Sequence, residues 1–274
     1  MTMLAGQKEQ IHRLWDDLSD FDTSQSQEAV LSLMAALVKL AGVANATWAG
    51  AIRMSGGDER DPLQGWRVAT FMTLVPLALQ SDEGHLGGVL RLWDRREIDP
   101  SFLLPLKEVG TFRTYSLRRG LPAEWFETPF YHRHYGFCGV HDVVFVAFPL
   151  NEDCESHFGF YAHQPVSDET IALLTYAVRG IKWFHRHLML SHGLLMASAP
   201  LTPTEHKVLQ LLLTEMTEKR IARELALGES ATHRHVVAIF RKFGVRSRAG
   251  LISLWLNHPA GLDVGIPGAP GRPD

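Results

Sequence analysis

Four side chains able to enter a groove lie on one face of a helix predicted over about residues 229–243. They are His233, Arg234, Val237 and Arg241, and their spacing makes them project together. The apolar residues of the same segment fall on the opposite face, where a core would hold them. The pattern leaves two interpretations, a solvated helix surface or a face that meets a charged partner.

The charges of the chain are divided unevenly along its length. The net charge is −3, yet residues 201–258 hold nine basic against five acidic residues, and residues 1–200 hold 17 against 23. An acidic body that carries a basic segment is the asymmetry expected when one part of a protein meets phosphate. This division favours the second interpretation of the 229–243 helix.

Helix start and stop signals surround that face. Thr202-Pro203-Thr204-Glu205 is a capping box with proline at the first helical position. Thr217 can cap a second, short helix, residues 226–228 read as a turn, and Gly244 suits the left-handed end of the third helix. A fourth helix from Ser247 is more apolar than a small bundle needs, which favours a dimer contact.

Several of these positions resemble the LuxR-type (GerE-like) helix-turn-helix. The matching residues are Leu201-Thr202-Pro203-Thr204-Glu205, Ile221-Ala222, Leu225, His235, Lys242 and Val245-Arg246-Ser247-Arg248-Ala249. The resemblance covers about residues 201–256 and implies a four-helix domain that binds double-stranded DNA as a homodimer, with its third helix in the major groove. It implies base contacts by His233, Arg234 and Val237. It implies phosphate contacts by Thr232, Arg241, Lys242 and Arg248.

The third helix departs from that family at its start. Gly228, Ala231, Thr232 and His233 stand where serine, threonine, valine and lysine are more usual. Gly228 weakens the helix cap. His233 lacks the fixed positive charge of lysine, so the face formed by His233, Arg234, Val237 and Arg241 has one cation fewer.

The first 200 residues alternate between helical and extended patterns. Helices are expected at 4–18, 26–41, 99–117, 122–135 (with a break near Pro129) and 168–196, and strands at 46–54, 66–74, 86–93, 142–150 and 156–161. This order predicts an α+β fold with a mostly antiparallel sheet and flanking helices, resembling PAS or GAF sensor domains. We therefore expect a sensing domain over 1–197, a DNA-binding domain over 198–258 and a flexible tail over 259–274.

A sensing domain needs a pocket, and aromatic side chains are its natural lining. The candidates are Trp48, Trp66, Phe126, Tyr131, Tyr135, Phe145 and Phe160. The ligand is a small molecule or a protein partner that the sequence does not identify. A phosphorylated receiver domain is disfavoured because Asp16-Asp17 precedes any strand, and an acyl-homoserine-lactone receptor stays open although Trp125, Tyr131 and Asp142 have unusual spacing.

No local motif indicates catalysis. The chain contains no nucleophile elbow, phosphate loop, dinucleotide fingerprint or His-Glu-Xaa-Xaa-His. The cluster His132-Arg133-His134, Cys138 and His141 leaves a metal or haem site as an alternative, but its spacing fits no standard finger. A catalytic N-terminal domain also stays an alternative, but it would need a site assembled only in three dimensions from residues distant in the sequence. We expect no metal, no cofactor and no enzymatic activity.

The chain as a whole is typical of a cytoplasmic protein. Its longest apolar run, residues 143–150, is far shorter than the ~20 residues of a membrane helix, and its N-terminal residues are charged. Two cysteines are too few for a disulfide framework. The sequence thus predicts a DNA-binding transcription regulator, without membrane contact, whose sensing domain controls the DNA-binding domain through dimer geometry.

Overall fold

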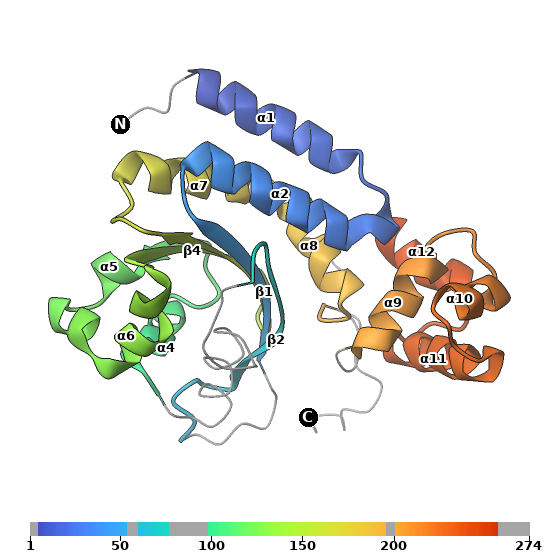
Figure 1. Cartoon of the computed structure of the whole chain (residues 1–274). Helices are drawn as coiled ribbons and strands as arrows, with labels where there is room; N and C mark the ends of the chain where they lie inside the picture. Colours follow the sequence, from blue (N-terminus) through green and yellow to red (C-terminus); the bar gives the residue numbers. More distant parts are fainter. Residues whose placement is uncertain (1–4, 54–59, 77–97, 196–200, 257–274) are drawn as a thin grey trace, which may run out of the picture.

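The computed structural model describes residues 5–53, 60–76, 98–195 and 201–256. Figure 1 shows a sheet with helices α1, α2, α7 and α8 on one side and the short helices α4, α5 and α6 on the other. Helices α9 to α12 form a separate group beside the end of α8. None of the helices within the described ranges is both long and apolar enough to cross a membrane.

The sheet is antiparallel throughout, with the strand order β2-β1-β5-β4-β3. Its strands are β1 (Asn45–Arg53), β2 (Trp66–Thr73), β3 (Arg113–Ser116), β4 (Asp142–Asn151) and β5 (Cys154–Ala162). The predicted hairpin joins β4 and β5. The predicted α+β fold is confirmed, while the strand expected at 86–93 lies outside the described residues.

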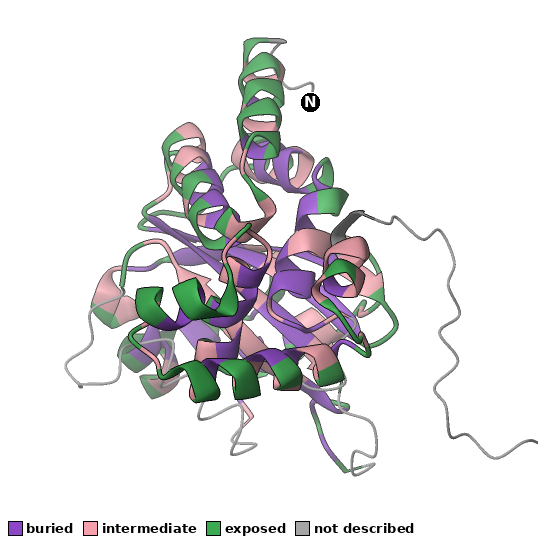
Figure 2. Ribbon diagram, turned by 90° about the vertical axis from the view of Figure 1, so that its right-hand side faces the viewer, coloured by how far each residue is buried: buried purple, intermediate pink, exposed green. Residues whose placement is uncertain are grey.

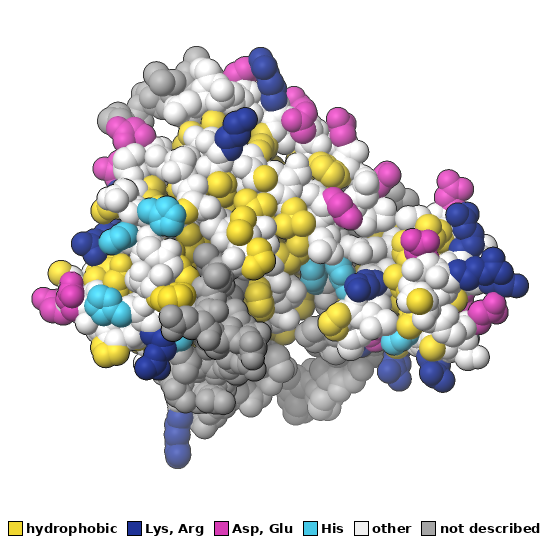
Figure 3. Space-filling view, viewed as in Figure 1, with side chains coloured by type: hydrophobic (Ala, Val, Ile, Leu, Met, Phe, Trp, Pro, Cys, Tyr) yellow, Lys and Arg dark blue, Asp and Glu magenta, His cyan; other side chains and the backbone are white. Residues whose placement is uncertain are grey.

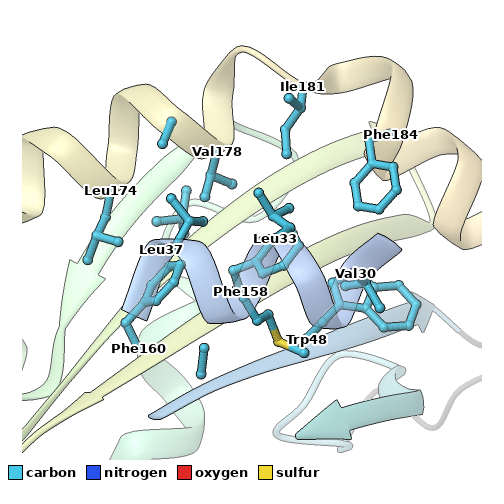
Figure 4. Packing of buried hydrophobic residues seen from close by; sticks show 14 of the residues in the cluster. Val30, Leu33, Leu37, Trp48, Phe158, Phe160, Leu174, Val178, Ile181 and Phe184 are labelled. Atoms are coloured by element: carbon cyan, nitrogen blue, oxygen red, sulfur yellow. The ribbon is translucent and has the colours of Figure 1, made fainter. Parts of the chain in front are cut away.

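One face of the sheet is covered by helices far apart in the sequence. They are α2 (Ser26–Ala41), α7 (Asp168–Arg179) and α8 (Lys182–Ser191). Trp48, Phe158 and Phe160 of the central strands are fully buried beneath them. Figure 4 shows Leu33 and Leu37 of α2 in the same core, between the sheet and α7. Helix α1 (Ala5–Ser19) lies along the outer side of α2 (Figure 1).

The opposite face is covered by short helical segments. They are α4 (Pro100–Leu103), η2 (Leu104–Leu106), α5 (Leu117–Gly120), η3 (Ala123–Glu127), α6 (Pro129–His134) and η4 (Gly136–Cys138). Their aromatic side chains form a second core, in which the Trp125 indole donates to Asp99 Oδ1 at 2.9 Å. The break predicted near Pro129 is confirmed, since proline begins α6.

The single helix predicted over 99–117 is wrong. Helical structure stops at Leu106, and Arg113–Ser116 form the edge strand β3 beside β4. Gly110 between them has a φ of +84°, a left-handed conformation that an α-helix does not contain. The strand is short, so its alternation was too weak to outweigh the helical periodicity of the residues before it.

The single long helix predicted over 168–196 is also wrong, because it divides into α7 and α8 at Gly180 and Ile181. The Trp15 indole of α1 occupies the break. A Cβ atom at residue 180 would lie 2.2 Å from Trp15, and the indole donates to Ala177 O at 2.9 Å. Arg179-Gly180 is a local signal for the end of a helix, whereas the contact that requires glycine there joins Trp15 to a segment 162 residues later in the sequence.

The four predicted C-terminal helices are present as α9 (Pro203–Leu212), α10 (Glu218–Glu224), α11 (Glu229–Lys242) and α12 (Arg248–Leu256). Thr202 and Glu205 make the expected reciprocal capping box, Thr217 caps α10, and Gly244 has a φ of +66°. Figure 2 shows these helices buried on one side and exposed on the other. The predicted boundary at 197/198 and the tail at 259–274 lie outside the described residues.

Candidate nucleic-acid interface and ligand cavity

Helix α11 turns its predicted reading face to the surface. His233, Arg234 and Arg241 are exposed, and Val237 is an exposed large aliphatic side chain at 50%. The opposite side of α11 packs Val236 and other apolar residues into the domain core. Figure 3 shows basic side chains gathered over the C-terminal helices on this view of the molecule. The face combines hydrogen-bonding cations with one apolar contact, as a groove-reading helix requires.

His233 contacts the neighbouring helix. Its Nδ1 lies 3.0 Å from Oε2 of Glu218, the first residue of α10. Both side chains remain largely solvent-accessible, at 66% and 44% exposure. The imidazole is therefore oriented by α10 while it stays open to a partner.

Lys242, expected at a phosphate, is engaged within the domain. Its ammonium donates to Glu205 Oε2 at 2.7 Å, and the same oxygen accepts from the backbone N–H of Thr202 at 2.7 Å. Burial alone would raise the pKa of Glu205, but the hydrogen bonds from Lys242 and Thr202 hold it below its ordinary value. Lys242 therefore ties the end of α11 to the start of α9.

Arg248 and Thr232 also lie away from the exposed face. Arg248 donates to the carbonyl oxygens of Leu212 and Met216, at 2.8 and 2.6 Å. Thr232 is completely buried. In this structure the two side chains support the packing of the four helices, and neither presents a free polar group to a phosphate.

A cavity of about 140 Å³ lies on the face of the sheet opposite α2, α7 and α8. Strand residues reach it by alternation, since successive side chains of a strand point to opposite faces. Its lining consists of Thr47, Ala49, Ala51, Trp66, Val68, Phe71, Ser101, Phe102, Pro105, Leu106, Val109, Arg113, Tyr115, Leu117, Tyr135, Phe145, Glu155, His157 and Tyr161. A mostly apolar wall with a few polar groups is typical of a small-molecule site.

A buried ion pair forms the charged part of the cavity. Arg113 of β3 donates from Nη1 and Nη2 to the two carboxylate oxygens of Glu155 on β5, both at 2.8 Å. The side chains are only 5% and 1% exposed. Glu155 also accepts from Gly110 N at 2.7 Å and lies 3.1 Å from His157 Nε2. Both terminal nitrogens of Arg113 and both oxygens of Glu155 are thus hydrogen-bonded, while the buried Nε of Arg113 has no partner among the described residues.

The protonation of this pair follows from its hydrogen bonds. Burial alone would raise the pKa of Glu155, but His157, Arg113 and Gly110 outweigh it and lower the pKa to about 2. The carboxylate is therefore ionised at neutral pH. Its charge is matched by the guanidinium of Arg113, so the two groups together present no net charge to the cavity.

Three tyrosines line the same cavity. Burial raises the pKa of Tyr115, Tyr135 and Tyr161, the last to about 12, so all three are neutral hydroxyl groups at physiological pH. Tyr115 stacks on Phe145 with ring centroids 5.2 Å apart. The ring of Phe145 lies against Gly159. A Cβ atom added at Gly159 would lie 2.9 Å from that ring. Glycine at this position makes room for the aromatic wall.

The structure divides the predicted ligand-binding residues into three groups. Trp66, Tyr135 and Phe145 line the cavity. Trp48 and Phe160 point to the other face of the sheet, into the core beneath α2 and α7, and Phe126 and Tyr131 belong to the aromatic core around α6. The prediction named other aromatic residues and missed the lining side chains of Phe71, Phe102, Tyr115 and Tyr161, and its restriction to aromatic residues also left out Arg113, Glu155 and His157.

A usable signal for the missed residues lies in the alternation of β5. Glu155, His157 and Tyr161 are spaced by two or four, so they share one face. Phe160, which the aromatic criterion selected, has the opposite parity. Charged residues on one face of a strand that is otherwise apolar indicate that this face meets something other than a plain core.

The histidine and cysteine cluster is not brought together as a metal centre. His132 lies 3.9 Å from Glu127, and His134 packs on the ring of Phe130 at 4.7 Å. Within the described ranges, no group of three or more histidine, cysteine or acidic side chains could hold a metal ion. Burial raises the pKa of Cys138, which keeps its thiol protonated.

The chain is similar in fold to several distant solved structures. SdiA in complex with octanoyl-rac-glycerol is 12% identical, with a TM-score of 0.46, over 92% of this chain and 95% of that chain. Escherichia coli SdiA in another crystal form is 14% identical, with a TM-score of 0.42, over 89% and 94%. The VqsR LBD domain from Pseudomonas aeruginosa is 14% identical, with a TM-score of 0.43, over 68% and 98%.

The C-terminal helices have a closer match. Residues 199–255 fit the profile of the bacterial regulatory proteins of the luxR family. The "Probable HTH-type transcriptional regulator GfsR" of Streptomyces halstedii is 34% identical over 64 residues, which are 23% of this chain. The match spans about a quarter, 26%, of that relative's length. The part of the chain that carries the exposed α11 face, residues 199–255, is a helix-turn-helix domain of the luxR family.

Proposed function

We propose that this protein is a transcription regulator that binds double-stranded DNA through α11. The observation that carries the proposal is the exposed face of α11, within a domain of the luxR family that holds nine basic against five acidic residues over 201–258. A basic module with a helix free to enter the major groove is the usual arrangement of helix-turn-helix proteins.

The exposed side chains divide into two roles. His233, Arg234 and Val237 lie toward the first half of α11 and contact base edges. Arg241 lies about two helical turns after His233. It is exposed and contacts a phosphate. Thr232, Lys242 and Arg248 were expected at phosphates too, and we propose instead that they support the packing of the domain, because each is buried or hydrogen-bonded within it.

The N-terminal sheet senses a small molecule in its cavity. The support is the apolar lining, the three tyrosines within it and the ion pair of Arg113 with Glu155. Because that pair is internally neutralised, a charged ligand would enter a buried site without a counter-charge. The ligand is therefore an uncharged, largely apolar molecule. Catalysis is no part of the proposal, since Arg113, Glu155 and His157 form a closed network.

We also propose the domain bounds, the cellular location, the oligomeric state and the mode of regulation. The sensing domain spans 1–197 and the DNA-binding domain 198–258, and the protein acts in the cytoplasm, in keeping with Cys138 and Cys154, which are not joined by a disulfide. It acts as a homodimer through α12, whose residues are mostly apolar. A ligand regulates DNA binding by favouring one arrangement of the two recognition helices, since equal affinity for two arrangements would shift neither.

The test uses enrichment of bound duplexes from a random-sequence DNA library. Arg234→Ala is expected to lose base preference at particular positions of the enriched site. Arg241→Ala is expected to weaken all sequences about equally and to lower the salt dependence of binding by about one counterion. Arg13→Ala, which removes an exposed cation from α1, is the control. Failure of the wild-type protein to enrich any sequence would contradict the proposal.

A further inference from the structure

The contact between Glu218 and His233 is a polar link that joins α10 to the reading face of α11. It is a hydrogen bond of 3.0 Å between residues 15 positions apart, made by side chains that both remain exposed. A pair of this kind on the surface contributes little to folding stability. Its consequence lies in the protonation pattern of the imidazole ring.

A carboxylate can only accept hydrogen bonds, so the nitrogen that faces Glu218 must carry the proton. That nitrogen is Nδ1 of His233. In a neutral imidazole one nitrogen carries a proton and the other is bare. Donation from Nδ1 to Glu218 therefore leaves Nε2 of His233 as a hydrogen-bond acceptor.

Acceptor character decides which bases such a ring can contact. In the major groove the amino groups of adenine and cytosine are donors, whereas guanine and thymine present acceptors at the corresponding places. A lysine or arginine side chain, which only donates, makes the opposite selection. An acceptor Nε2 pairs with adenine N6 or cytosine N4.

We propose that Glu218 is a specificity-positioning residue, which fixes the tautomer of His233 so that this side chain selects adenine or cytosine at one position of the DNA site. The inference rests on the proposed function, because it takes α11 to be the reading helix. Glu218 acts through His233 and contacts no base itself. A residue of the second helix of the domain thereby contributes to the sequence that the third helix prefers.

The experiment is enrichment from a random duplex library at pH 8, with the full chain. His233→Ala first identifies the position that His233 reads, as the one where base preference is lost relative to the wild type. At that position the wild type is expected to prefer adenine or cytosine by about fivefold, the value of one net hydrogen bond. Glu218→Gln removes the requirement for an Nδ1 proton, because an amide can donate or accept, and is expected to abolish most of this preference.

Two further variants test whether the base preference depends on the contact between Glu218 and His233 or only on the charge of α10. Glu224→Gln removes the same charge from the exposed end of α10 and should leave the preference as it is in the wild type. His233→Lys replaces the acceptor with donors and should move the preference to guanine or thymine. The far-ultraviolet circular dichroism and total DNA affinity of Glu218→Gln should stay close to those of the wild type, because the pair is exposed.

Three results would overturn the inference: a wild-type preference for guanine or thymine at that position, a Glu218→Gln preference equal to the wild type, or an equal loss with Glu224→Gln. These outcomes differ from failure of the proposed function. If His233→Ala and Arg234→Ala both leave every position unchanged, α11 does not read bases and the proposed function fails. If Arg234→Ala changes a position and Glu218→Gln changes none, the function stands and only the role of Glu218 is rejected.

Discussion

At the scale of single residues, the ion pair of Arg113 and Glu155 determines what the cavity accepts. A guanidinium in an apolar pocket would by itself attract a carboxylate ligand. Here Glu155 occupies both of its terminal nitrogens at 2.8 Å. The protein's own carboxylate thus takes the place that an anionic ligand would fill. This pairing explains how a basic residue can line a pocket proposed for uncharged molecules.

Replacement of Glu155 should reverse the proposed preference of the cavity for uncharged over anionic molecules. Three probes of one shape are suitable for a cavity of this volume: methyl benzoate, benzoate and benzylamine. With the wild type at pH 7.5, thermal-shift titration is expected to favour methyl benzoate. Glu155→Gln leaves Arg113 without a counter-charge, so benzoate affinity should rise about tenfold. Benzoate should also recover part of the stability that the unpaired charge costs, about 3 kcal/mol.

The control for this prediction is Glu152→Gln in the exposed β4–β5 turn, which should bind the probes as the wild type does. A wild type that binds benzoate more tightly than methyl benzoate would contradict the neutral cavity. So would a Glu155→Gln protein that is folded, as judged by circular dichroism, yet gains no affinity for benzoate.

At the scale of elements, the caps of the DNA-binding domain are the features most open to prediction from sequence. Thr202, Thr217 and Gly244 each act within one helical turn, so the residues that make the signal are also those that respond to it. The packing of Trp15 on Gly180 is different, because it joins two helices far apart in the sequence. Helix caps can therefore be predicted from neighbouring residues, whereas a contact between distant helices cannot.

The cavity shows the same distinction within a sheet. Alternation tells that Phe160 and Tyr161 point to opposite faces, but it does not tell which face the long helices cover. Trp48 and Phe160 were chosen for their aromatic character and lie in the core beneath α2 and α7. The choice of face depends on how α7 and α8 return across the sheet, a long-range contact that no short segment contains.

The left-handed glycine of the DNA-binding domain provides a prediction at this scale. Gly244 has a φ of +66° with open space around it, so alanine there is penalised by conformation alone. Gly244→Ala should lower the free energy of unfolding by about 1 kcal/mol. Gly250 lies within α12 without a positive φ, and an added Cβ there would lie 3.4 Å or more from its neighbours, so Gly250→Ala should instead raise the free energy of unfolding by about 0.5 kcal/mol. Urea unfolding of both variants tests this, and equal losses would contradict it.

At the scale of the whole molecule, the two parts meet where the end of α8 packs on α9. The ring of His192 stacks on that of His206 with centroids 4.3 Å apart, and its other neighbour is Trp48 at 4.9 Å. The backbone N–H of Leu201 donates to His192 O at 3.3 Å. Trp48 follows the cavity-lining Thr47 along β1. Strand β1 therefore lines the cavity with residues of one face, and on its other face Trp48 contacts His192 of the ring stack between the two parts.

The protonation of the two histidines should control this contact. Burial, reinforced by the adjacent His192, lowers the pKa of His206 to about 3, and burial also lowers the pKa of His192. The docked form therefore favours neutral rings. Docking has its full strength above the ordinary histidine pKa of 6.5 and weakens as the pH falls from 6.5 toward 3, by about tenfold per pH unit for each proton taken up.

Acidification should consequently separate the DNA-binding domain from the sheet while both stay folded. Among the described residues, nothing accepts a hydrogen bond from the buried Nε2 of His206, so a proton there has no partner in the docked form. Small-angle X-ray scattering between pH 7.5 and 5 should show the radius of gyration rise at constant circular dichroism. His206→Phe preserves the ring stack and removes the group whose pKa is lowered to about 3, while His192 can still take up a proton, so this variant should expand less than the wild type at pH 5. A wild type that stays compact at pH 5, or a His206→Phe protein that expands as much as the wild type, would show that other groups control the docking of the two domains.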